Sequence, residues 1–183
     1  VMNLTDVDDK TIAGFEALMR WEHPEMGLLA PARFIRLAEE TGLIVPLGEW
    51  VLQKACTAHQ RWQAMRLQLS RMAVNLSPRQ FLHAGLLADT LRILKQTSCH
   101  GKYIELEITE SMVMHDPSGA VALIRQIKDL GVRIAMDDFG TGYSSLAYLR
   151  RFPIDSLKVD RSFIADVPHD AGNVAITQAI IGM

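Results

Sequence analysis

Two adjacent carboxylates, Asp137 and Asp138, stand where an apolar run over 132–136 ends and a glycine-bearing turn over 139–145 begins. A buried carboxylate is costly to desolvate unless a cation offsets the cost. Two acids in succession at the end of a strand therefore indicate a metal ion or another strong partner. Asp and Gly are also ordinary turn residues, so a solvated turn is the alternative interpretation.

Polar side chains lie on or directly after each of the strand-like runs of the chain, including the one that ends at Asp137. We expect these strands at 12–20, 72–75, 103–109, 133–137 and 156–160. Alternation along each run puts its polar residues on one face. The carboxyl ends of parallel barrel strands meet at one rim, where active sites of such barrels lie. Each residue alone could be structural, but buried barrel strands have no solvated face for five such sets. The residues concerned are Glu16, Arg20, Asn75, Glu105, Glu107, Glu110, Asp137, Asp138, Lys158 and Asp160.

Helical patterns separate these runs, and the alternation predicts βαβ units with a parallel sheet. Asp116 is expected to cap a helix that begins at Pro117, and Gly131 suits the position after its end. The Rossmann glycine fingerprint and the Walker phosphate loop are both absent, and the polar rim favours a closed barrel over an open sheet. We expect helices at 31–40, 47–65, 80–95, 117–130, 144–151 and 173–181.

Composition narrows the class of function. The 183 residues are 49% hydrophobic, enough for one sizeable core, and the net charge of −2 argues against binding to polymeric nucleic acid. Cys56 and Cys99 both fall in apolar segments and indicate reduced, buried thiols and a cytoplasmic location. No histidine pair has metal-binding spacing, so oxygen ligands and Mg²⁺ or Mn²⁺ are favoured over zinc. Neither a signal peptide nor a membrane-spanning run is visible, although a tether elsewhere stays open.

Taken together, five segments resemble the EAL domain family, the bacterial cyclic di-GMP phosphodiesterases. The three-letter string at 16–18 would be a weak signal alone, whereas the combination is specific, and its order and spacing cover nearly the whole chain. The segments are Gly14–Trp21, Val74–Ser77, Glu105–Ser111, Asp137–Ser145 and Leu157–Phe163.

The resemblance implies a TIM-type (β/α)₈ barrel whose first strand is antiparallel to the others, and it implies roles for single residues. The expected metal ligands are Glu16, Asn75, Glu107 and Asp137, with Asp137 bridging two cations and Asp138 completing the second site. Lys158 would contact the nucleophilic water, and Glu110 would steady the loop after Asp138. Arg20 and Asp160 are the expected substrate-binding residues.

The implied reaction is metal-dependent, in-line hydrolysis of cyclic di-GMP to the linear dinucleotide, with two Mg²⁺ or Mn²⁺ ions at the site. Two cations can share a water and stabilise charge on the attacking and leaving oxygens. The implied partners are cyclic di-GMP, a second copy in a homodimer, and fused sensory or diguanylate-cyclase domains. The helix expected at Ser144–Arg151 is the candidate dimer contact.

The chain departs from the family in length, because a barrel of this type needs about 250 residues. The family's last two strands, with a further glutamate ligand and a glutamine, would lie beyond Met183, and 1–4 would be a remnant of the first strand. We therefore expect 1–183 to be a partial EAL domain that alone binds metal weakly and turns over slowly. A non-catalytic cyclic di-GMP receptor or interaction module is the alternative. A Mg²⁺-dependent enolate-forming barrel would need a second Lys or His base, and none is evident.

Overall fold

The computed structural model describes residues 3–5, 12–67, 71–140 and 151–182. The chain divides into two compact units. The first comprises 1–106 and 126–133, and the second comprises 107–125 and 134–183. Strand β6 (Ile104–Thr109) runs from the first unit into the second, one residue shorter than expected because η2 (Gly101–Tyr103) precedes it.

The sheet of the first unit has the order β1-β2-β5-β6. Strand β1 (Asn3–Thr5) pairs antiparallel with β2 (Ile12–Ala17), and β2 pairs in parallel with β5 (Met72–Asn75). The antiparallel first strand is therefore confirmed, and β5 has the predicted bounds. The strand expected at 12–20 is wrong at its end, because β2 stops at Ala17.

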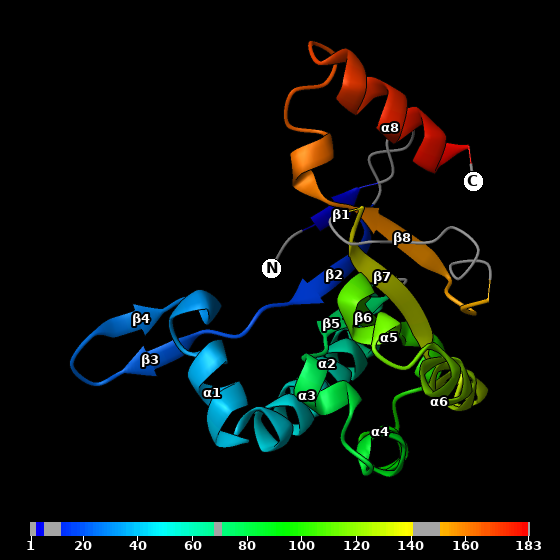
Figure 1. Ribbon diagram of the computed structural model, residues 1–183. Coiled ribbons are helices and arrows are strands. Elements are labelled where there is room, and N and C mark those ends of the chain that lie inside the picture. Colours follow the sequence, from blue (N-terminus) through cyan, green and yellow to red (C-terminus); the bar gives the residue numbers. More distant parts are fainter. Residues whose placement is uncertain (1–2, 6–11, 68–70, 141–150, 183) are drawn as a thin grey trace. The chain divides into compact units, whose positions relative to one another are not determined.

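A hairpin that the sequence did not predict follows β2. It consists of β3 (Trp21–His23) and β4 (Gly27–Leu29), which pair antiparallel and extend away from the end of β2 in Figure 1. The turn is held by His23, whose Nδ1 accepts the two amides of residues 25 and 26 at 3.2 Å. Strands of three residues are too short to show an alternating pattern, which explains the omission.

The helices of the first unit differ from the expected ones in their bounds and number. The helix expected at 31–40 is split into η1 (Pro31–Arg33) and α1 (Ile35–Thr41), and α2 spans Ile44–Ala64. The single helix expected at 80–95 is wrong. It is two helices, α3 (Pro78–Phe81) and α4 (Leu86–Gln96), because Ser77 and Gln80 form a capping box that starts α3 earlier.

The second unit has the strand order β6-β7-β8, and its β7 (Arg133–Phe139) pairs in parallel with β8 (Ser156–Val159). Its helical elements are α5 (Glu110–Met114), α6 (Pro117–Asp129), η3 (Arg161–Phe163) and α8 (Ala171–Ile181), of which α6 ends in the first unit. The cap prediction is confirmed, since Asp116 Oδ1 accepts the Gly119 amide at 3.1 Å.

The helix expected at 144–151 lies, apart from Arg151, outside the described residues. Among the helices of the described part, none combines the length and the apolar character that a membrane crossing needs.

Candidate active site

The two adjacent acids occupy a β-bulge between β7 and β8. Met136 pairs with Leu157 and Phe139 with Val159, so that Asp137 and Asp138 together face the single residue between them on β8, Lys158. Asp138 takes a left-handed backbone (φ 53°), which Asp tolerates better than most residues. Bulges re-aim side chains and are common beside active sites. Here the bulge sets two acids against one lysine.

Lys158 carries the positive charge of this cluster. Its Nζ forms an ion pair with Glu107 Oε1 and lies 3.9 Å from Asp137 Oδ2. The Glu107 side chain is fully buried, whereas 24% of Lys158 and 29% of Asp137 remain exposed. A buried carboxylate needs a cation close by. The ammonium group supplies that charge in the described structure.

Asp138 lies near two other carboxylates as well as the lysine. Burial raises its pKa above the ordinary value, and the neighbouring charges of Asp137 and Asp160 raise it further, while Lys158 acts in the opposite direction. Its amide donates to Asp137 Oδ1 at 3.0 Å. Carboxylates are therefore crowded here, and an additional cation would relieve their repulsion.

Glu110 holds the end of β7 from the first residue of α5. It is 3% exposed, and its Oε2 accepts the amide of Gly140 at 3.2 Å. Gly140 has φ +99°, and a Cβ there would lie 2.7 Å from the Phe163 ring, so only glycine fits. The buried Glu110 carboxylate thus fixes the backbone just after the two acids. The loop that Glu110 would steady, as the resemblance implies, begins at this point.

In the first unit, Glu16 and Asn75 lie together. Their strands are neighbours, and Asn75 Nδ2 donates to Glu16 Oε1 at 2.7 Å. A hollow of about 280 Å³ opens at the ends of β2 and β5, lined in part by Leu18, Asn75 and Ser77. The hydrogen bond orients the amide so that its carbonyl oxygen is left for another partner.

Arg20 lies beyond the end of β2 and is exposed. Its Nη1 donates to the Met19 carbonyl at 2.8 Å, and it lines an apolar groove of about 640 Å³ together with Trp21, Phe34 and Trp50. A guanidinium at an open groove is suited to binding an anion.

Asp160 follows β8 and is engaged locally. Its Oδ1 accepts the Ser162 amide at 2.9 Å and also the Ser162 hydroxyl, and so caps η3. These hydrogen bonds hold the pKa of Asp160 below its ordinary value. The carboxylate stays charged, with Oδ2 free of the cap.

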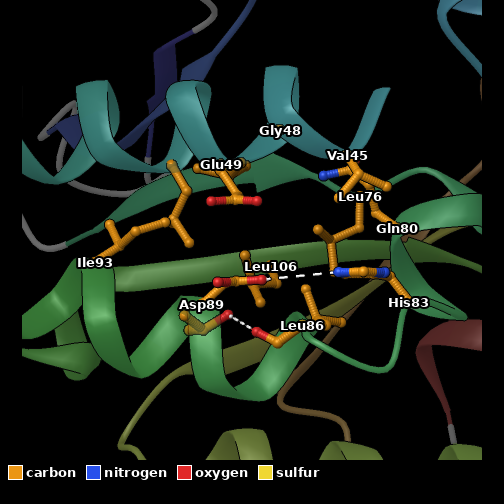
Figure 2. A pocket seen from close by; sticks show the side chains of 13 residues that line it. Val45, Gly48, Glu49, Leu76, Gln80, His83, Leu86, Asp89, Ile93 and Leu106 are labelled. Atoms are coloured by element: carbon orange, nitrogen blue, oxygen red, sulfur yellow. Dashed lines mark hydrogen bonds and ion pairs between the residues drawn. The ribbon is translucent and has the colours of Figure 1, made fainter. Parts of the chain in front are cut away.

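A smaller cavity between α2 and α4 is not a ligand site. It measures about 20 Å³, room for about one water, and its wall is mostly aliphatic. His83 Nε2 lies 3.9 Å from Asp89 Oδ2, and Figure 2 shows both side chains among the residues that line the cavity.

One charged residue of the predicted rim has a different setting. Glu105 is 3% exposed and binds Arg71 at 2.9 Å and Arg133 at 3.5 Å, both in the first unit. It is neutralised at the start of β6, whereas Glu107 lies further along the same strand. The basic residues at 71 and 133 each precede or open a strand, a signal that could have been read from the sequence.

The structure thus brings the predicted residues into two clusters, Glu16 with Asn75 in the first unit and Glu107, Asp137 and Lys158 in the second. Within the described residues, no three His, Cys, Asp or Glu side chains are grouped so as to hold a metal ion. A cage formed by Glu16, Asn75, Glu107 and Asp137 stays a prediction.

Known proteins resemble the chain closely. It is 46% identical over 170 residues to the bifunctional diguanylate cyclase/cyclic di-GMP phosphodiesterase MucR of Pseudomonas aeruginosa, covering 93% of the chain and 25% of MucR. The cyclic di-GMP phosphodiesterase NbdA of the same organism is 44% identical over 175 residues, 96% of the chain and 22% of NbdA. The chain therefore spans about a quarter of the length of these curated relatives.

Solved structures agree with the sequence relatives. A MucR phosphodiesterase in complex with c-di-GMP matches with a TM-score of 0.89 and 46% identity, over 94% of the chain and 70% of that structure. The EAL enzyme Bd1971, with cAMP and cyclic di-GMP bound, matches with a TM-score of 0.89 and 32% identity, over 98% of the chain and 50% of that structure. The predicted TIM-type α/β fold is confirmed.

The family profile described as "EAL domain" matches residues 4–183, almost the full length of the sequence. The polar residues at the ends of β2, β5, β6, β7 and β8 lie within this match. The chain belongs to the EAL domain family.

Proposed function

We propose that this chain is part of an EAL catalytic domain, 1–183, that hydrolyses cyclic di-GMP to the linear dinucleotide with the help of divalent cations. Family membership supports the proposal, as do two relatives above 40% identity that are named cyclic di-GMP phosphodiesterases. The observation that carries it is the bulge that sets Asp137 and Asp138 against Lys158, with the buried Glu107 beside them.

The donor atoms fit Mg²⁺ or Mn²⁺. Glu16, Asn75, Glu107, Asp137 and Asp138 offer only carboxylate and amide oxygens, the ligands that these hard cations prefer. The raised pKa of Asp138 among neighbouring carboxylates points the same way, since a cation would stabilise its charged form. Two such ions, when bound, would activate a shared water and offset charge on the phosphate.

The chain's own side chains have separate tasks in this proposal. The Lys158 ammonium, held by Glu107 and near Asp137, places positive charge beside the attacking water without taking a metal position. Arg20 binds a phosphate from the exposed end of β2, and Asp160 contacts the substrate through the oxygen that its cap leaves open. Glu110 keeps the backbone at Gly140 in place, so that the acids before it hold their orientation.

The test is hydrolysis of cyclic di-GMP, followed by chromatography of the linear product, with Mg²⁺ or Mn²⁺ added to metal-free protein. The protein is used at its natural full length. We expect turnover that Asp137→Asn abolishes and that Lys158→Met lowers more in kcat than in KM. Lys95→Met, an exposed lysine on α4, is the matched control and should leave turnover unchanged.

Two outcomes would overturn the proposal. One is normal turnover in Asp137→Asn. The other is binding of cyclic di-GMP in EDTA, measured by calorimetry, with no product after metal is restored, which would establish a receptor instead.

We further propose that the natural protein is cytoplasmic, acts as a homodimer and carries regulatory domains. The name of MucR, which pairs a diguanylate cyclase with a phosphodiesterase, supports the last point. Light scattering coupled to gel filtration tests the dimer, and a monomer at all concentrations would refute it.

A further inference from the structure

The predicted ligand Asn75 lies at the point where β5 ends. The register of β5 with β2 runs to Val74, and one residue later the Asn75 side chain donates to Glu16 Oε1 at 2.7 Å. Its carbonyl oxygen can face a cation only while the backbone keeps this orientation. The contacts that fix the chain just after Asn75 therefore bear on the proposed metal site.

A capping box fixes the chain two residues after Asn75. The Ser77 amide donates to Gln80 Oε1 at 3.1 Å, and the Gln80 amide donates to Ser77 Oγ at 3.2 Å. Pro78 follows and keeps Ser77 extended, with ψ at 159°. Gln80 is 7% exposed, so water competes little for its side-chain oxygen. The hydrogen bond from Ser77 to Gln80 thus sets the direction in which the chain leaves Asn75.

Gly48 on α2 makes room for the Gln80 side chain. A Cβ at position 48 would overlap with Gln80 Nε2 and lie 2.5 Å from its Cδ. Both residues line the cavity of Figure 2, and together with Asn75 and Ser77 they line the hollow at the ends of β2 and β5. Glycine inside a helix is less favourable than alanine. The space that Gln80 needs explains why a glycine stands here.

Arg79 ties the same short helix to α1. Its Nη1 donates to the carbonyl of Glu39 at 2.6 Å and to that of Glu40 at 3.3 Å, both in the last turn of α1. Helix α3 is therefore bound to α1 through Arg79 and packed against α2 at Gly48. The capping box rests on a support that two other helices hold in place.

We propose that Gln80 and Gly48 are positioning residues for the Asn75 carbonyl oxygen at a divalent cation. The inference rests on the proposed function, which makes Asn75 a metal ligand. Gln80 acts through the Ser77 amide, and Gly48 acts through Gln80, so neither touches the cation or the substrate. Partners that orient a metal ligand in this way change metal affinity about 10–100-fold when they are removed.

The first measurement needs no metal. Hydrogen–deuterium exchange of the metal-free, full-length protein, resolved by fragmentation mass spectrometry, reports on the Ser77 amide. Gln80→Leu cannot accept the hydrogen bond from this amide, so exchange at Ser77 should become faster. Gly48→Ala should have the same effect, because the added methyl group displaces the Gln80 side chain. Gln80→Glu keeps an acceptor oxygen that capping boxes also use, and Ser77 should exchange as in the unmodified protein.

The second measurement is the affinity for Mn²⁺, from the electron paramagnetic resonance signal of the free ion. We expect Gln80→Leu and Gly48→Ala to bind Mn²⁺ about 10-fold more weakly, and Gln80→Glu to bind it normally. Gly48→Ala removes a glycine from a helix interior, so a general loss of helix stability does not account for its weaker binding. Gln63→Leu, at an exposed position of α2, is the matched control and should change neither measurement.

A double substitution tests the order of action. In a protein that already carries Gln80→Ala, Gly48→Ala should weaken Mn²⁺ binding no further. Additive losses, unchanged exchange at Ser77 in Gln80→Leu, or unchanged Mn²⁺ affinity in that variant would overturn the positioning role and leave the proposed function standing. An unmodified protein that binds no Mn²⁺ would instead overturn the proposed function, and this inference with it.

Discussion

Replacing Lys158 by methionine tests the charge balance at the bulge. The change keeps most of the side-chain volume but removes the cation that pairs with Glu107, whose side chain has no exposed surface. Removing one partner of a buried ion pair costs about 3–5 kcal/mol. Because Lys158 is 24% exposed, water can reach the site, and we expect a smaller loss of about 2–3 kcal/mol in the free energy of unfolding.

The assay is urea unfolding followed by circular dichroism, without added divalent cations. A loss of this size corresponds to a fall in Tm of roughly 4–12 °C for a chain of this length. Adding Glu107→Gln to Lys158→Met removes the uncompensated charge, so the double variant should recover most of the stability. Lys95→Met, on an exposed part of α4, should change the free energy of unfolding by less than about 0.5 kcal/mol.

The reasoning fails if the two substitutions are additive. Independent sites add within about 0.5 kcal/mol, whereas a true pair shows a coupling energy well above that value. A Lys158→Met variant as stable as the unmodified chain would likewise show that Glu107 does not depend on this ammonium.

The remaining predictions concern local geometry. Gly140→Ala should lower the free energy of unfolding by more than Gly131→Ala in urea titrations. Both glycines have positive φ, which costs about 1–2 kcal/mol for alanine, but only the first would meet a ring at 2.7 Å; equal losses would contradict this. Asp116→Ala should cost about 1 kcal/mol through the lost cap of α6, and no change in urea would refute the cap. Ser162→Ala should raise the lowered pKa of Asp160 toward its ordinary value in an NMR titration. A carboxyl whose pKa is lowered by folding stabilises the folded chain at pH values above its ordinary pKa, and this stabilisation is lost as the pH falls through the lowered pKa. An unchanged pKa in Ser162→Ala would disprove the assigned cause.

Local signals were sufficient for some elements. Strand β5 has the predicted bounds, and α6 begins at Pro117 after its Asp116 cap. Caps and short apolar runs are encoded by a few adjacent residues, so they can be read without knowledge of the remaining chain. The helix expected at 80–95 was wrong because its apolar spacing continues across the break between α3 and α4, and the capping box of Ser77 and Gln80, which starts α3 earlier, was overlooked.

Pairings between distant residues could not be read in this way. The alternation over 133–137 gives no sign that an extra residue lies at Asp137 and Asp138, because a bulge depends on the partner strand. Alternation along the run predicts one face for Glu105 and Glu107, but the sequence did not reveal that Arg71 and Arg133 pair with Glu105 while Lys158 pairs with Glu107. Among the predicted metal ligands, Asn75 donates to Glu16 and the Asp138 amide donates to Asp137, and the common centre stays a prediction.

The bulge between β7 and β8 also has an evolutionary consequence. Asp137 and Asp138 fill one step of the ladder together, so deleting either residue would make the pairing regular but turn the remaining acid to face a different neighbour. A change of side chain there leaves the spacing intact, whereas a change of length shifts every residue up to Gly140 and its contact with Glu110. Lineages of this domain should therefore tolerate substitutions at these two positions more readily than insertions or deletions.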